Sequence, residues 1–97
     1  MNYNITDKIK KSFRKFGRFA SREQMIVEVL KNTPVPLTTS EISEYINEAT
    51  NRNYIASNIA SAITTLKHDN IIVMIETTER QPNNIFVRRY RLNYEKL

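Results

Sequence analysis

The amino-acid sequence predicts a mainly helical α+β fold, in which helices come first and a two-stranded β-hairpin comes last. Apolar residues recur every three or four positions through residues 5–67, which is the spacing of one helical face. Further along, β-branched and apolar runs at 71–75 and 85–92 are typical of strands. A chain of 97 residues can enclose one modest core, so we divide it into an N-terminal arm, residues 1–20, and one domain, residues 21–97.

The arm is expected to form a basic amphipathic helix that ends near Gly17, the only glycine of the chain. Its apolar ridge consists of Ile5, Ile9, Phe13 and Phe16. The ridge fits packing on its own domain or on a second copy, an interfacial membrane helix, or a basic segment that is disordered until a polyanion such as nucleic acid binds. One small domain has little surface to cover such a ridge. We therefore expect the protein to form a homodimer through the ridge.

The net charge of +5 is distributed unevenly along the chain. Residues 1–22 hold seven basic residues against one acid and so carry +6, whereas residues 23–97 carry −1. A concentrated positive patch binds a polyanion, which means nucleic acid or an anionic membrane surface, or it is only a solvated face; of these we expect contacts with a nucleic-acid backbone. The basic residues of this segment are Lys8, Lys10, Lys11, Arg14, Lys15, Arg18 and Arg22.

Two capping boxes mark the starts of the next two helices. Ser21 with Gln24 opens one helix, which ends before Pro34 because proline cannot continue it. Thr38 with Glu41 opens another helix over residues 39–49.

A further helix is expected over residues 54–67, followed by the hairpin. The apolar stripe of this helix includes Ile55, Ile59, Ile63 and Leu66, which we place in the core. The polar residues 79–84 form the turn between the two strands.

Four stretches of the sequence have a shared pattern of order and spacing: Pro36-Leu37-Thr38-Thr39-Ser40-Glu41-Ile42, the stripe from Ile55 to Leu66, Leu66-Lys67-His68-Asp69-Asn70-Ile71-Ile72, and Tyr90-Arg91-Leu92-Asn93. Together with the order of the elements, they resemble the winged-helix family of helix-turn-helix proteins over about residues 22–93. Family members often have glycine where Asn70 stands, and asparagine tolerates the same left-handed backbone. The resemblance implies a three-helix helix-turn-helix core with a C-terminal wing and assigns no subfamily.

In this family the third core helix usually enters the major groove, so the resemblance assigns base reading to residues 53–64. The side chains opposite the core stripe are short and neutral, which suits close approach to base edges; the alternative is the solvated side of an amphipathic helix. The expected base-reading residues are Asn53, Tyr54, Ser57, Asn58, Ser61 and Thr64. Further contacts with the DNA backbone are expected from Arg52, Arg80, Arg88, Arg89 and Arg91.

The residue types present exclude most enzyme chemistry. With no cysteine, one histidine and one glycine, the chain lacks thiol nucleophiles, thiolate metal ligands and a glycine-rich phosphate loop. We therefore expect no enzyme, no metal, no cofactor and no small-molecule effector.

The function expected from these observations is a small homodimeric transcriptional regulator that binds double-stranded DNA in the cytoplasm. No signal peptide or membrane-spanning run is apparent in the sequence. One alternative is a winged-helix protein-interaction module, which the neutral helix at 54–67 and the acidic helix at 39–49 favour. The other is peripheral membrane binding through the N-terminal helix.

Overall fold

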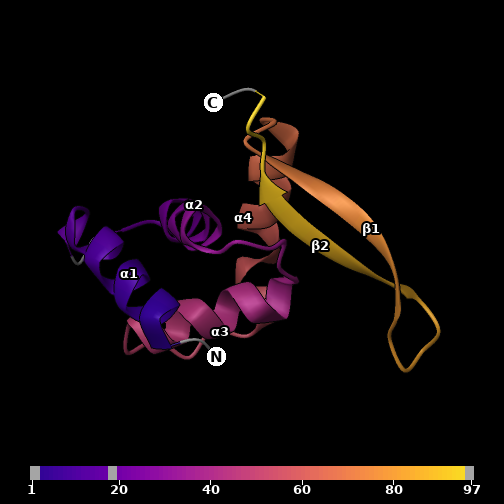
Figure 1. Ribbon diagram of the computed structural model, residues 1–97, viewed down its shortest axis with the longest axis horizontal. Coiled ribbons are helices and arrows are strands. Elements are labelled where there is room, and N and C mark those ends of the chain that lie inside the picture. The colour runs from indigo at the N-terminus through magenta and orange to yellow at the C-terminus, as the bar shows by residue number, and fades with distance from the viewer. Residues whose placement is uncertain (1–2, 18–19, 96–97) are drawn as a thin grey trace.

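The computed structural model describes residues 3–17 and 20–95, which form helices followed by an antiparallel hairpin in the predicted order. The elements are α1 (Tyr3–Arg14), α2 (Arg22–Asn32), α3 (Thr39–Ala49), α4 (Ala56–His68), β1 (Ile72–Arg80) and β2 (Phe86–Leu92). The helices pack together and the hairpin projects away from them, so that α1 and the tip of the hairpin lie at opposite ends of the molecule (Figure 1). None of the helices in the described part of the chain is long and apolar enough to cross a membrane.

The two predicted capping boxes fix the starts of α2 and α3. The Ser21 hydroxyl accepts from the Gln24 amide at 3.1 Å, and the Gln24 side chain accepts from the Ser21 amide at 2.8 Å. Thr38 and Glu41 make the equivalent pair of bonds at 3.2 and 2.9 Å. Each box satisfies two amides near a helix start, where backbone donors lack helical partners. Both predictions are confirmed.

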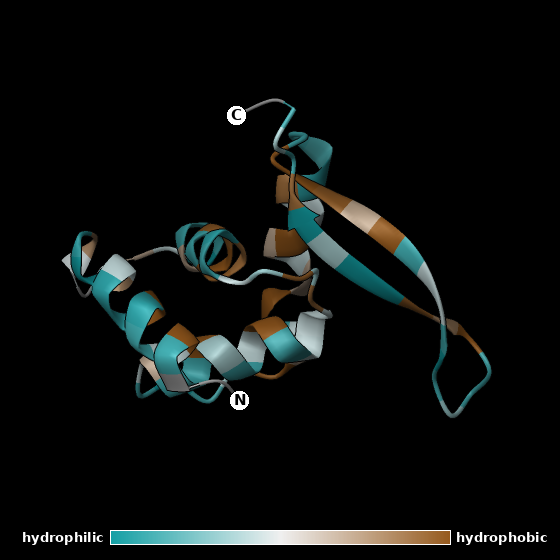
Figure 2. Cartoon of the chain, viewed as in Figure 1, coloured by the Kyte–Doolittle hydropathy of each residue, from teal (hydrophilic) through white to brown (hydrophobic). Residues whose placement is uncertain are grey.

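Helix α4 begins two residues later than the sequence predicts, and this changes the place of Ile55. Tyr54 and Ile55 lie in the connection before the helix, and the backbone of Ile55 is extended. The Ile55 amide donates to the Asn58 side-chain oxygen at 2.8 Å, which caps the first turn. Ile55 is therefore 65% exposed instead of lying in the core as predicted. The apolar residues of the stripe within the helix are buried as predicted, and Figure 2 shows hydrophobic residues on the side of α4 turned toward α2 and α3.

The hairpin extends further than its apolar residues indicate. β1 and β2 pair from Ile72 with Leu92 to Glu76 with Arg88, and an irregularity precedes the last pair near the turn. The second half of β1 is polar, so no apolar run marks it in the sequence. Its two ends pair with β2 at Glu76 and Arg80, and between them the Thr77 hydroxyl donates to the Val87 carbonyl at 2.9 Å.

The turn between α4 and the hairpin takes the expected left-handed conformation. Asn70 has a φ of 59°, which asparagine tolerates better than most residues. Its carbonyl accepts from the side chain of Asn93 at 2.9 Å, so this turn also holds the end of β2.

Helix α1 packs into the same core as the other helices. Ile9 is fully buried, Phe13 is 6% exposed, and Ile5 packs at the edge of this core, while Phe16 is half-buried. The expectation that the ridge of Ile5, Ile9, Phe13 and Phe16 needs a second copy is corrected, because apolar residues of α2 and α3 already cover most of it.

Polar contacts also hold α1 in place. The Asn32 side chain of α2 donates to the Ser12 hydroxyl at 3.0 Å. Lys15 forms an ion pair of 2.9 Å with Glu28, whose side chain is only 6% exposed. A buried carboxylate needs such a partner, so Lys15 is engaged in holding α1 against α2.

Candidate nucleic-acid interface

Helix α4 presents a polar face made of short side chains. Its inward stripe packs in the core, which leaves the opposite side exposed. The hydroxyl groups of Thr64 and Thr65 donate to helix carbonyls at 3.1 Å and keep their oxygen lone pairs for other donors. Of the predicted base-reading residues, those exposed on this helix are Ser57, Asn58, Ser61 and Thr64.

Asn58 serves the helix as well as its surface. Its side-chain oxygen accepts from the Ile55 amide at 2.8 Å, which uses one of that oxygen's two lone pairs and orients the side chain. Asn58 therefore caps the helix, and its reading of a base stays a prediction. Asn53 is exposed in the connection before α4.

Tyr54 lies at the centre of a basic cluster at the start of α4, which we call the Tyr54 cluster (Arg22, Arg52 and Tyr54). The guanidinium carbons of Arg22 and Arg52 lie 5.2 and 5.5 Å from the centre of the tyrosine ring. Arg52 also donates to the Tyr54 hydroxyl, and Arg22 donates to the Asn58 carbonyl at 2.9 Å. The cluster thus joins the start of α2, the α3–α4 connection and the first turn of α4.

The backbone under this cluster is fixed by Asn47 of α3. The Asn47 side chain donates to the Tyr54 carbonyl at 2.7 Å and accepts from the Tyr54 amide at 2.8 Å. Sequence reasoning gives Asn47 no role. Its position could have indicated one, because Asn47 lies near the end of α3 and precedes a connection without glycine. The backbone groups of such a connection need hydrogen-bond partners, which an amide side chain can supply.

The Tyr54 cluster carries positive charge that its surroundings do not neutralise. Within residues 3–17 and 20–95, no ion pair joins Arg22 or Arg52 to a carboxylate. Burial raises the pKa of the Tyr54 phenol, but hydrogen bonds and charge from Arg22 and Arg52 outweigh it, so the net pKa is lowered. The N-terminus of a helix adds partial positive charge at the same place. This arrangement suits an anion such as a phosphate group.

The cations of α1 differ in their neighbourhoods. A hollow of about 500 Å³ between α1 and the end of α3 is lined by Lys10 and Arg14, together with Thr50. An adjoining hollow of about 320 Å³ shares Thr50 and reaches Arg52. Lys10 and Arg14 therefore continue the positive surface of the Tyr54 cluster. Lys15 pairs with Glu28, and the predicted backbone contact Arg18 lies outside the described residues.

The predicted wing cations are held in different ways. Arg80 lies 4.2 Å from the centre of the Phe86 ring and donates to the carbonyl and side chain of Asn84 at 3.1 Å. Arg91 is half-buried and donates to the carbonyl of the next residue at 3.0 Å. Arg88 is exposed on β2. Arg80 and Arg88 are thus the wing cations best placed for contact with a phosphate.

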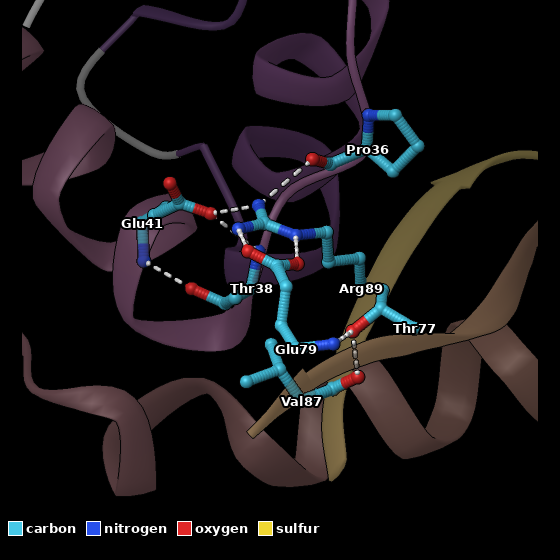
Figure 3. Close-up of polar contacts among 7 residues, drawn as sticks. All are labelled: Pro36, Thr38, Glu41, Thr77, Glu79, Val87 and Arg89. Atoms are coloured by element: carbon cyan, nitrogen blue, oxygen red, sulfur yellow. Dashed lines mark hydrogen bonds and ion pairs between the residues drawn. The ribbon is translucent and has the colours of Figure 1, made fainter. Parts of the chain in front are cut away.

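Arg89 has a structural role instead of the predicted contact with DNA. It donates to both carboxylate oxygens of Glu79 at 2.7 and 3.0 Å, to Glu41 at 2.6 Å and to the Pro36 carbonyl at 3.2 Å (Figure 3). The hydrogen bonds with Glu79 are the largest cause of a raised pKa for Arg89, and they lower the pKa of Glu79. Because two carboxylates neutralise this arginine, the prediction that it holds the DNA backbone is corrected. Arg89 joins the wing to the start of α3.

No protein-family model and no curated protein matches the chain in sequence. Among solved structures, the chain is similar to the Helicobacter pylori ferric uptake regulator Fur, with a TM-score of 0.63 and 23% identity. The match covers 93% of this chain and 56% of that regulator, which is described as having three functional metal binding sites. The likeness and the observed elements show a winged-helix fold, as the sequence resemblance implies. Among residues 3–17 and 20–95, no group of three or more potential ligands (His, Cys, Asp or Glu) is placed to hold a metal.

Proposed function

We propose that this protein is a transcriptional regulator that binds double-stranded DNA, with α4 entering the major groove and the Tyr54 cluster seated on the phosphate backbone. The observation that carries the proposal is the pair of exposed, uncompensated arginines at the N-terminus of α4, beside a face of short polar side chains. The structural likeness to a regulator supports the same function.

Different residues of the proposed interface contact the phosphates and the bases. Phosphate contacts supply most of the affinity of DNA-binding proteins and no direct sequence information. The Tyr54 cluster, Lys10 and Arg14 can supply such contacts, and Arg80 and Arg88 can extend them along the wing. Base recognition then depends on Ser57, Ser61 and Thr64, whose short side chains let the helix approach base edges.

The experiment is a binding titration with duplex DNA of random sequence between about 50 and 200 mM salt, monitored by fluorescence anisotropy. The double variant Arg22→Gln/Arg52→Gln should bind about thirtyfold more weakly near 0.15 M salt, and the logarithmic salt slope should fall by about 1.8, because two phosphate contacts are lost. The substitution Lys31→Gln is the control, since it removes one exposed cation from the other end of α2. Wild-type protein that binds no duplex at 50 mM salt would refute the proposal. An unchanged slope in the double variant would refute the assignment of the cluster.

A protein-interaction module is the second candidate, and one observation favours it. A hollow of about 560 Å³ lies between the start of α3 and the wing, beside Ile85 and Phe86, which are 54% and 44% exposed. Exposed apolar side chains beside a hollow are a feature of binding surfaces. The absence of DNA binding in the titration would favour this candidate. Homodimerisation and a cytoplasmic location stay predictions, and the ridge of α1 no longer supports the first.

A further inference from the structure

Ile55 is the large apolar side chain most exposed among the described residues, and it lies at the tip of α4. It is 65% exposed, directly after Tyr54 and directly before the first residue of the helix. The remaining exposed large apolar residues lie elsewhere, in the α2–α3 connection, at the wing and after β2. An isoleucine among arginines and polar groups does not contribute to the core.

The backbone holds Ile55 in this position from both sides. The preceding residue, Tyr54, has its amide and its carbonyl bound by Asn47. The Ile55 amide is bound by Asn58 inside the first turn of the helix. Turning Ile55 into the core would break the cap of α4, so the fold presents its side chain outward at a fixed place.

The chemistry of the DNA surface indicates what this side chain meets. The Tyr54 cluster draws phosphates to this end of α4, which brings the helix tip to the base edges. In the major groove the bases present hydrogen-bonding groups and one apolar group, the 5-methyl of thymine. A branched aliphatic side chain cannot satisfy the hydrogen-bonding groups, whereas it can exclude water from a methyl group.

We infer that Ile55 is a specificity-determining residue that contacts the 5-methyl group of a thymine in the target site. The inference rests on the proposed DNA binding and deepens it, because it names the base that this end of α4 selects. Burying one methyl group is worth about a fourfold change in affinity.

The test uses a duplex selected by the full-length protein from a random library and the same duplex with every thymine replaced by uracil, which removes only the methyl groups. Wild-type protein should bind the uracil duplex about fourfold more weakly. The Ile55→Ser variant should bind the thymine duplex more weakly and should no longer distinguish the two. Val35→Ser is the matched control, since Val35 is a similarly exposed aliphatic residue, 58%, far along the chain from α4; it should keep the wild-type ratio. Circular dichroism checks that each variant is folded.

The outcomes separate this inference from the proposed function. Equal binding of the two duplexes by wild-type protein overturns the role of Ile55 and leaves DNA binding intact. A selected site without thymine, or an Ile55→Ser variant that keeps the wild-type ratio, has the same consequence. Failure to select any duplex overturns the proposed function and the inference together.

Discussion

Two arginine sites on the predicted interface differ in what surrounds them. Arg22 and Arg52 lie against the Tyr54 ring at the start of α4, and no carboxylate of the described chain pairs with them. Arg89 lies on the wing with hydrogen bonds to Glu79 and Glu41. All three carry the same charge, yet only the first two leave a positive field outside the protein.

An arginine without a carboxylate partner attracts anions, whereas an arginine paired with carboxylates stabilises the fold. An arginine that two carboxylates neutralise has little left for a phosphate, but it fixes the geometry of the elements that it joins. Arg89 connects β2, β1 and the start of α3, and so sets the direction in which the wing leaves the helices (Figure 3). The same contrast recurs at the end of α1, where Lys15, directly after the helix, is paired and Arg14 lines the hollow that adjoins the Tyr54 cluster.

The largest effect that we expect is a loss of stability when the packing of α1 is disturbed. This packing also places Arg14 next to the Tyr54 cluster. Phe13→Ala should lower the free energy of unfolding by about 3–5 kcal/mol, because Phe13 is 6% exposed in the core. Chemical denaturation measures the change, and light scattering at tens of micromolar protein should show no change of oligomeric state. If the wild-type protein is a dimer and Phe13→Ala is a stable monomer, Phe13 lies in a dimer interface and does not mainly dock α1 on its own domain.

The next largest effect should follow from removing Arg89, which joins the wing to the start of α3. Arg89→Met should cost about 1–2 kcal/mol of unfolding free energy, because Glu41 and Glu79 lose a hydrogen-bonded partner at a partly exposed site. The DNA affinity of the folded variant should change by no more than about twofold, since Arg89 supplies no phosphate contact. Arg88→Met, at a neighbouring exposed arginine, should show the opposite pattern. A fall in salt slope for Arg89→Met would place this arginine on DNA after all.

A smaller effect on DNA binding should distinguish the cations of α1 that line the hollows from those that do not. We expect Lys10 and Arg14, which line one hollow, to share a single phosphate contact. Lys10→Gln/Arg14→Gln should therefore weaken DNA binding roughly fivefold and lower the salt slope by about 0.9. Lys8→Gln/Lys11→Gln removes the same charge from exposed positions that do not line these hollows, and it should leave the slope nearly unchanged. Equal losses in the two variants would show that only net charge matters.

The smallest effect is the pH dependence of the link between Arg89 and Glu79. Hydrogen bonding to Arg89 lowers the folded-state pKa of Glu79 below its usual value near 4.5. A lowered carboxyl pKa adds stability above the unfolded-state pKa, and this contribution is lost as the pH falls through the folded-state pKa. Stability should therefore decline below about pH 4.5, and Glu79→Gln should decline less steeply between pH 5 and 3 in urea unfolding. Parallel curves for both proteins would contradict the pairing.

The sequence predicts the features that depend on neighbouring residues. Both capping boxes join residues three positions apart, and the left-handed turn at Asn70 depends on one residue type. The order of helices and strands follows from periodicity, which is also local.

The features that the sequence could not predict join residues far apart in the chain. Arg89 and Glu41 are 48 positions apart, and Arg22 reaches the carbonyl of Asn58 across 36 positions. The spacing of Ile55 fits the apolar stripe of the helix. However, hydrogen bonds between Asn58 and the Ile55 amide and between Asn47 and the Tyr54 backbone make the helix begin after Ile55. Charge and periodicity therefore indicate where the proposed interface lies, whereas contacts between distant residues decide which of its side chains are free to bind a ligand.

The central claim is that DNA is bound at the start of α4, and a nuclear magnetic resonance titration of isotope-labelled protein with a short duplex tests it most directly. We expect the backbone amides of Ser57 and Ser61 and the side-chain Nε–H signals of Arg22 and Arg52 to shift on binding, because these groups meet the duplex. The Nε–H signal of Arg89 and the backbone amide of Glu44, an exposed acidic residue of α3, should stay in place. Shifts centred on Arg89 and Glu44, with the start of α4 unaffected, would show that DNA binds at another surface.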